Sequence, residues 1–175
     1  GSIADTVWNT TDPGSEAYQH AGNWDLYAKW EGYNYTVSYN GNKPAAASGS
    51  VSDVPAADSK VFGTAIELGA APSLTGWTFV GWCKNSDGSG SVYPAGSSFN
   101  DDPSDMTDGG NLTLYGVWTV NKYTVAFNAG GGTGSMGTQE KTYGVDCALI
   151  ANAFTRTGYT FRDWTITYEG TKYTF

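Results

Sequence analysis

The chain has 175 residues and carries 17 Asp and Glu against 9 Lys and Arg, a formal net charge of −8. This balance argues against nucleic acids and anionic membranes as partners, because both attract clusters of basic residues. With 24 Gly, 7 Trp, 12 Tyr and 7 Phe, the composition also excludes a disordered chain, which has few aromatics, and collagen, which has glycine at every third position.

No apolar run is long enough to cross a membrane, so we expect no membrane-spanning segment. The two cysteines, Cys83 and Cys147, lie far apart without a CxxC motif or a histidine partner, which argues against a zinc site or a redox motif. We expect two unpaired, mostly buried thiols, with a disulfide between them as the alternative.

The most informative feature of the sequence is that it repeats itself. Three pairs of segments match each other, in the same order along the chain: Asn23–Trp30 with Asn111–Trp118, Tyr35–Asn40 with Tyr123–Asn128, and Leu74–Trp82 with Arg156–Trp164. Internal repeats define structural units. We therefore predict the second half of a repeat over 1–31, a complete repeat over 32–119, and a third repeat over 120–175 that lacks its closing strand.

Within the complete repeat the local pattern is mostly that of strands. Apolar and polar residues alternate over 35–39 and again over 112–118, the period of two that marks a half-buried strand. Asn40-Gly41 and Asp87-Gly88 are turn signals, because glycine adopts positive φ without strain.

Two segments have a weaker helical pattern. Thr64–Leu68 and its counterpart Asp146–Ile150 predict one or two helical turns, with Thr64 or Asp146 as the N-cap. The sequence therefore predicts small, strand-dominated α+β modules arranged in tandem.

The repeated sequence segments also form a recognisable family pattern. Tyr123–Met136, Thr142-Tyr-Gly144, Phe154–Phe161 and Trp164 closely resemble the Listeria–Bacteroides repeat, also called the internalin-type B-repeat. The resemblance implies a variation of the β-grasp fold, arrayed in secreted or surface-anchored bacterial proteins as a stalk or a receptor-binding module. The family has no assigned catalytic residues to carry over.

The chain departs from the family pattern in three places. These are a long loop over Gly41–Ser59, an acidic insertion over Asn100–Gly110, and a third repeat that stops at Phe175 before its Leu-Tyr-x-x-Trp strand. If the chain has a recognition site, we expect it where the repeats differ, within 44–57 and 101–110.

The tryptophans fall in columns of the repeat that recur as large apolar residues. Trp24, for example, aligns with Leu112, and a column that alternates Trp with Leu is filled for volume rather than for stacking on a sugar ring. We therefore expect the seven Trp in cores rather than on a carbohydrate-binding surface. Trp77 aligns with Tyr159 and is the best candidate for partial exposure.

No other motif predicts chemistry. Asp101, Asp102, Asp105 and Asp108 could offer oxygens to Ca²⁺, but their spacing is not that of an EF-hand, and a solvated loop is the favoured interpretation. The glycine pattern over 132–137 lacks the helix and acidic residue of a dinucleotide site. We predict no metal, no cofactor and no catalytic residues, and we expect the single His20 in an exposed loop.

These observations predict a non-catalytic, extracellular repeat module that acts as a spacer or stalk in a bacterial cell-surface or secreted protein. The alternative is an adhesin module that binds a host glycoprotein or glycan, with Trp77, Asp101, Asp102 and Asp105 as possible contacts. Neighbouring repeats are the expected partners. The unmatched closing strand over 25–30 also predicts self-association by strand exchange.

Overall fold

The computed structural model describes residues 27–175. The chain forms two units, Gly1–Glu31 and Gly32–Phe175, and each is described by itself. In the first unit residues 27–31 have no regular structure, and Tyr27 and Trp30 are 87% and 88% exposed. The expectation that the 23–30 segment repeats the strand of 111–118 is therefore wrong for its described part. Trp8, His20 and Trp24 lie outside the described residues.

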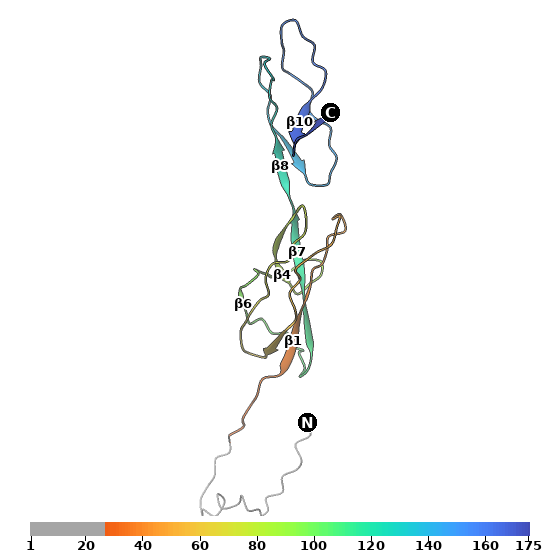
Figure 1. Cartoon of the computed structure of the whole chain (residues 1–175). Helices are drawn as coiled ribbons and strands as arrows, with labels where there is room; N and C mark the ends of the chain where they lie inside the picture. The colour runs from red at the N-terminus through yellow and green to blue at the C-terminus, as the bar shows by residue number, and fades with distance from the viewer. Residues whose placement is uncertain (1–26) are drawn as a thin grey trace, which may run out of the picture. The chain divides into compact units, whose positions relative to one another are not determined.

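A five-stranded sheet carries the complete repeat (Figure 1). Its strands, in spatial order, are β2 (Asp58–Val61), β1 (Asn34–Asn40), β7 (Asn111–Val120), β4 (Trp77–Cys83) and β5 (Val92–Tyr93). β1 and β7 are parallel, whereas every other neighbouring pair in the sheet is antiparallel. The first and the last strand of the repeat thus lie together at the centre of its sheet.

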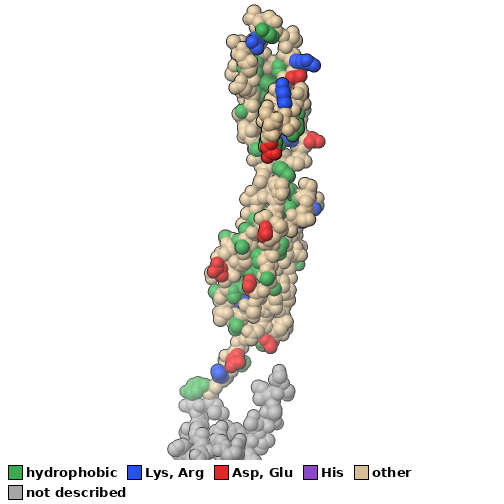
Figure 2. Space-filling model, in the orientation of Figure 1, with side chains coloured by type: hydrophobic (Ala, Val, Ile, Leu, Met, Phe, Trp, Pro, Cys, Tyr) green, Lys and Arg blue, Asp and Glu red, His purple; other side chains and the backbone are tan. Residues whose placement is uncertain are grey.

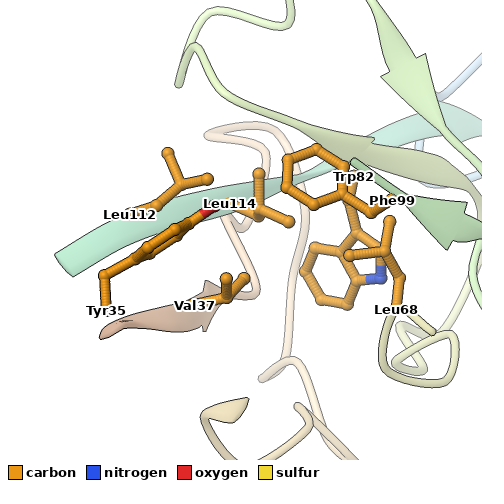
Figure 3. Close-up of a cluster of buried hydrophobic side chains, with 7 residues drawn as sticks. All are labelled: Tyr35, Val37, Leu68, Trp82, Phe99, Leu112 and Leu114. Carbon is orange, nitrogen blue, oxygen red and sulfur yellow. The ribbon is translucent and has the colours of Figure 1, made fainter. Parts of the chain in front are cut away.

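One apolar cluster forms the core of this repeat. Figure 3 shows side chains of β1 facing side chains of β7, with the indole of Trp82 beside them. The buried members are Tyr35, Val37, Leu68, Trp82, Phe99, Leu112 and Leu114. Because alternate residues of a strand point to the same face, the period-two pattern of β1 and β7 places four of these side chains in the core.

The predicted α+β class is wrong, because the described residues contain strands and no helix. Where we expected a helical turn, β3 (Ile66–Glu67) pairs with β6 (Ser98–Phe99). Ile66 and Leu68 both pack into the core, a spacing of two that an extended chain satisfies and a helix does not. Thr64 does not cap a helix; its hydroxyl donates to the Val61 carbonyl in a turn.

The third repeat, over 120–175, contains two separate hairpins. β8 (Lys122–Val125) pairs with β9 (Gln139–Thr142), and β10 (Thr165–Tyr168) pairs with β11 (Thr171–Thr174). Asp146–Ile150 is an irregular segment rather than a helix. Trp164 packs against three phenylalanine rings, at centroid distances of 4.8 to 6.1 Å: Phe127, Phe154 and Phe161.

Candidate functional site

Trp77 lies beside the long loop that distinguishes the complete repeat. It begins β4 and is half-buried, and with Ser50, Ser52, Ser73 and Thr75 it lines an open hollow of about 390 Å³. The loop is held there by a pair of backbone hydrogen bonds, because Ser52 and Ser73 each donate an N–H to the other's carbonyl at 3.0 Å. The hollow therefore combines hydroxyl groups with one indole, a chemistry that suits a neutral polar ligand.

Asp102 does not lie in a free acidic loop. Its Oδ1 accepts hydrogen bonds from Lys60 Nζ and Tyr35 Oη, both at 2.5 Å, and its Oδ2 accepts from the Gly63 amide at 2.8 Å. Burial alone would raise the pKa of Asp102, but the bonds from Lys60, Tyr35 and Gly63 outweigh it and hold that pKa below its ordinary value. The carboxylate of Asp102 is thus a hydrogen-bond acceptor for Lys60, Tyr35 and Gly63 at the edge of the core.

Asp101 is engaged in a second, more exposed cluster. Its Oδ2 forms an ion pair with Lys84 Nζ at 2.7 Å and accepts a hydrogen bond from the Tyr93 hydroxyl. The bonds from Lys84 and Tyr93 lower the pKa of Asp101. Burial, followed by the bond to Asp101, raises the pKa of Tyr93 to about 12. Both groups therefore keep their ordinary charge at neutral pH.

The two remaining aspartates of the loop do not join them. Asp108 Oδ1 accepts the Asn34 amide at 2.9 Å, and Asp105 is exposed at the edge of a shallow depression that Met106 also lines. Within residues 27–175, no three His, Cys, Asp or Glu side chains lie close enough together to hold a metal ion. The four sequence-predicted contacts thus occupy four separate places: Trp77 lines the hollow, Asp101 and Asp102 form different ion pairs, and Asp105 lies at the shallow depression.

The two cysteines differ in environment. Cys83 is buried at the end of β4, whereas Cys147 is exposed, which corrects the expectation that both are buried.

Sequence reasoning did not reveal the hydrogen bonds that join the complete repeat to the third repeat. β7 ends at Val120, β8 begins at Lys122, and Asn121 alone separates them. The Asn121 amide donates to the Gly76 carbonyl at 2.9 Å, and the Tyr143 amide donates to the Asn121 carbonyl at 2.9 Å. The only sequence signal of this joint was the shortness of the linker.

Side chains make further contacts at this joint. A Cβ on Gly76 would lie 2.0 Å from the ring of Tyr143, so the aromatic ring of one repeat lies directly over the glycine of the other. Thr78 Oγ1 also donates to the Asn121 Oδ1 at 2.6 Å. Asn121, the single linker residue, is thus hydrogen-bonded to both repeats.

Charged side chains are scattered over the described surface, without a basic patch on the face in view (Figure 2). Among residues 27–175, no helix is long and apolar enough to span a bilayer.

Two proteins of Evansella cellulosilytica are similar to this chain. One, named "Putative membrane protein", is 33% identical over 148 residues, which cover 83% of this chain and 20% of that protein. Another, named "Putative Gly-rich membrane protein", is 30% identical over 112 residues, which cover 62% of this chain and 12% of that protein. The chain thus spans a fifth or less of these relatives. No solved structure matches it significantly.

The sequence pattern of the Listeria-Bacteroides repeat domain matches the chain twice, over residues 35–117 and 123–175. The first match covers the five-stranded sheet and its core, and the second covers the two hairpins around Trp164. The resemblance seen in the sequence is confirmed: the chain belongs to the Listeria-Bacteroides repeat domain family, a repeat family of bacterial surface-type proteins.

Proposed function

We propose that the chain is a non-catalytic spacer module that holds other parts of an extracellular bacterial surface protein apart. The observation that carries this proposal is the joint at Asn121. In repeat arrays each unit contacts its neighbours, and the stiffness of the array depends on these contacts. A strand that continues from one repeat into the next with a single bonded residue between them restricts bending.

The proposal divides the chain at the same boundaries that the sequence predicts: part of a repeat over 1–31, a complete repeat over 32–119 and a third over 120–175. Its partners are the neighbouring repeats, and the names of the two relatives, "Putative membrane protein" and "Putative Gly-rich membrane protein", support a role in a surface protein. The spacer role needs no ligand, since the structure of each repeat supplies length and the joint supplies stiffness.

The stiffness of the joint can be measured as a distance distribution between two spin labels. Cys147 is exposed and provides one label in the third repeat, Ser104→Cys provides a second in the complete repeat, and Cys83 is too buried to react. We expect a narrow distribution in electron–electron double resonance. Insertion of two glycines after Asn121 should broaden it.

The chain offers a matched pair of substitutions for the same measurement. Gly76 and its repeat counterpart Gly158 have φ values of +78° and +79°, but only Gly76 lies under a ring, and nothing approaches within 4 Å of a Cβ at Gly158. Both Ala variants suffer the same backbone strain. Gly76→Ala should broaden the distribution and Gly158→Ala should not. A wild-type distribution as broad as that of the glycine insertion would contradict the spacer proposal.

A second candidate function rests on the hollow beside Trp77. It combines the residue that sequence reasoning singled out with Ser50 and Ser52 of the loop that the third repeat lacks. Hydroxyl groups around one aromatic side chain suit a glycan, which binds through hydrogen bonds and ring stacking. Under this alternative the module is an adhesin for a host glycoprotein or glycan.

A glycan array tests this alternative. We expect an adhesin to bind a restricted set of glycans, and Trp77→Ala to weaken that binding by roughly tenfold or more, as removal of an aromatic anchor does. Tyr159→Ala, at the equivalent position of the third repeat, is the matched control and should retain binding. Absence of binding, or equal loss in both variants, would rule out this site.

A further inference from the structure

Lys60, near the end of β2, lies beside the side chains of Asn100 and Asp102. The side chain of Lys60 is fully buried, and that of Asp102 is 9% exposed. Lys60 Nζ lies 2.5 Å from Asp102 Oδ1 and 3.3 Å from Asn100 Oδ1. The ring of Tyr35 flanks the same nitrogen, with its centroid 5.5 Å away. One buried amine therefore contacts a carboxylate and a carboxamide at once.

The buried amine of Lys60 lies directly against the carboxylate of Asp102. Removing an ammonium ion from water is costly, so a buried lysine either keeps an ion pair or gives up its proton. The carboxylate of Asp102 is close enough to accept that proton directly. A neutral Lys60 has a lone pair on Nζ and is a nucleophile.

The neighbouring carboxamide is the suitable electrophile. Asn100 Oδ1 accepts a hydrogen bond from Lys60 Nζ, which places its Cγ next to the nucleophile and polarises the carbonyl. Asp102 is less suitable, because an ionised carboxylate resists attack, and the pKa of Asp102 is held low by Lys60 and Tyr35. An ionised Asp102 is instead a general base, and Tyr35 and Gly63 orient it.

We propose that Lys60 and Asn100 form an intramolecular isopeptide bond, with Asp102 carrying the proton. Asp102 takes a proton from the Lys60 ammonium, and the Nζ lone pair forms a bond to Cγ of Asn100. The Cγ–Nδ2 bond then breaks, and Nδ2 takes up the two protons that Nζ has lost, one of them through Asp102, and leaves as an ammonium ion. The Lys60 ammonium and the Asn100 carboxamide thus become a secondary amide plus an ammonium ion, without any oxidant or reductant.

The surroundings fit the two requirements of this reaction. Lys60 is buried, so water does not compete for the proton transfer, while Asn100 lies at the surface, so ammonia can leave. The new bond would join residues 40 positions apart and fix β2, an edge strand, to the segment that follows β6. This inference stands on the geometry of the cluster and does not rest on the spacer role.

The third repeat provides an internal comparison. Tyr35 pairs with Lys60 across β1 and β2, and Tyr123 pairs with Lys141 in the same register across β8 and β9. Lys141 Nζ, however, donates to the Val145 carbonyl, and it forms no ion pair with any carboxylate of residues 27–175. Lys141 is therefore the counterpart of Lys60 in the third repeat, but its amine contacts a backbone carbonyl rather than a carboxylate and a carboxamide.

Mass spectrometry of the full denatured chain tests the proposal. We expect the intact mass to fall short of the sequence mass by one ammonia, about 17 Da. Because Asn40-Gly41 can also lose ammonia by forming a succinimide, the loss must be mapped. The expected digest contains a branched peptide that joins Lys60 to Asn100, and trypsin should fail to cleave after Lys60.

Variants separate this bond from an ordinary ion pair. Lys60→Met and Asn100→Ala should each restore the full mass, and Asp102→Asn should slow the loss in freshly made protein. Lys141→Met and Lys84→Met, which remove lysines outside the cluster, should still lose ammonia. An unmodified intact mass in the mature wild-type chain overturns the proposal, as does a loss of water, about 18 Da, mapped to Lys60 and Asp102. Neither result depends on whether a variant folds.

Discussion

Among individual residues, the tryptophans show how far a repeat column predicts a side chain's environment. Trp82 is completely buried, and its Nε1 donates to the Gly69 carbonyl at 3.1 Å, as a core column requires. Trp118 donates to the Gly41 carbonyl and packs edge-on against Phe79. Trp30, in the same column as Trp118, is 88% exposed. The column predicts a large apolar residue, and neighbouring strands decide whether it is buried.

This contrast gives a prediction for stability. Trp82→Ala removes a fully buried ring and should lower the free energy of unfolding by about 3–5 kcal/mol, as large-to-small core substitutions do. Trp30→Ala changes an exposed residue and should stay within about 0.5 kcal/mol of the wild type. Urea denaturation followed by circular dichroism measures both. Equal losses for the two variants, at a dilution where the chain is monomeric, would mean that Trp30 packs within its own chain, contrary to the structure.

The candidate site was only partly predictable at this scale. The sequence singled out Trp77 and the aspartates because they are aromatic or acidic residues in places where the repeats differ. It did not reveal Lys60, which is the partner of Asp102. A lysine in a short strand usually points to solvent, and only the packing of Tyr35 over Nζ shows that this one does not.

Among the elements, the strands were predictable and the helical turns were not. β1 and β7 have a clear alternation of apolar and polar residues, so local pattern and tertiary burial agree. Ile66–Glu67 is too short for a period to be read. Its conformation follows from pairing with Ser98–Phe99, which is distant in sequence. Short apolar segments of this kind take the structure that their neighbours allow.

The link between repeats is also decided by tertiary contacts. The sequence shows that few residues separate the strands of 111–120 and 122–125. It does not show that Asn121 bonds to Gly76 on one side and to Tyr143 on the other. A linker without such bonds would act as a hinge, since a short loop by itself fixes no angle.

For the whole molecule, the open edge of β8 is the feature with the clearest consequence. Among the described strands β8 pairs only with β9, whereas its counterpart β1 has β2 on one edge and β7 on the other. Beside β8 is an open groove of about 750 Å³, lined mainly by apolar side chains that include Tyr123, Val125 and Phe175. An unpaired strand edge next to an apolar groove accepts a further strand.

We propose that the 25–30 segment of a second copy adds to this edge, since it repeats the Leu-Tyr-x-x-Trp pattern of β7. Light scattering after size exclusion should show dimers or longer assemblies whose share rises with concentration. Replacing Tyr27 and Trp30 with Ser should abolish them. A strict monomer at high concentration would contradict the proposal.

A proline substitution provides a control for the edge itself. Thr36, the β1 counterpart of Thr124, donates its amide to the Gly110 carbonyl, at the β7 side of the strand. Thr124→Pro therefore removes an amide from the open edge and spares the pairing with β9. This variant should fold and remain monomeric. Continued assembly by Thr124→Pro would show that the copies meet elsewhere.

The sequence by itself determined the repeats, the family, the strands over 34–40 and 111–120, and the large apolar residues available for the cores. These are properties of local pattern and of self-similarity, and both can be read along one chain. The tertiary structure decided the all-β class of residues 27–175, the burial of Lys60 beside Asp102 and Asn100, and the bonded joint at Asn121. Each of these depends on contacts between residues distant in sequence, whose packing determines which groups lose water and which partners they meet.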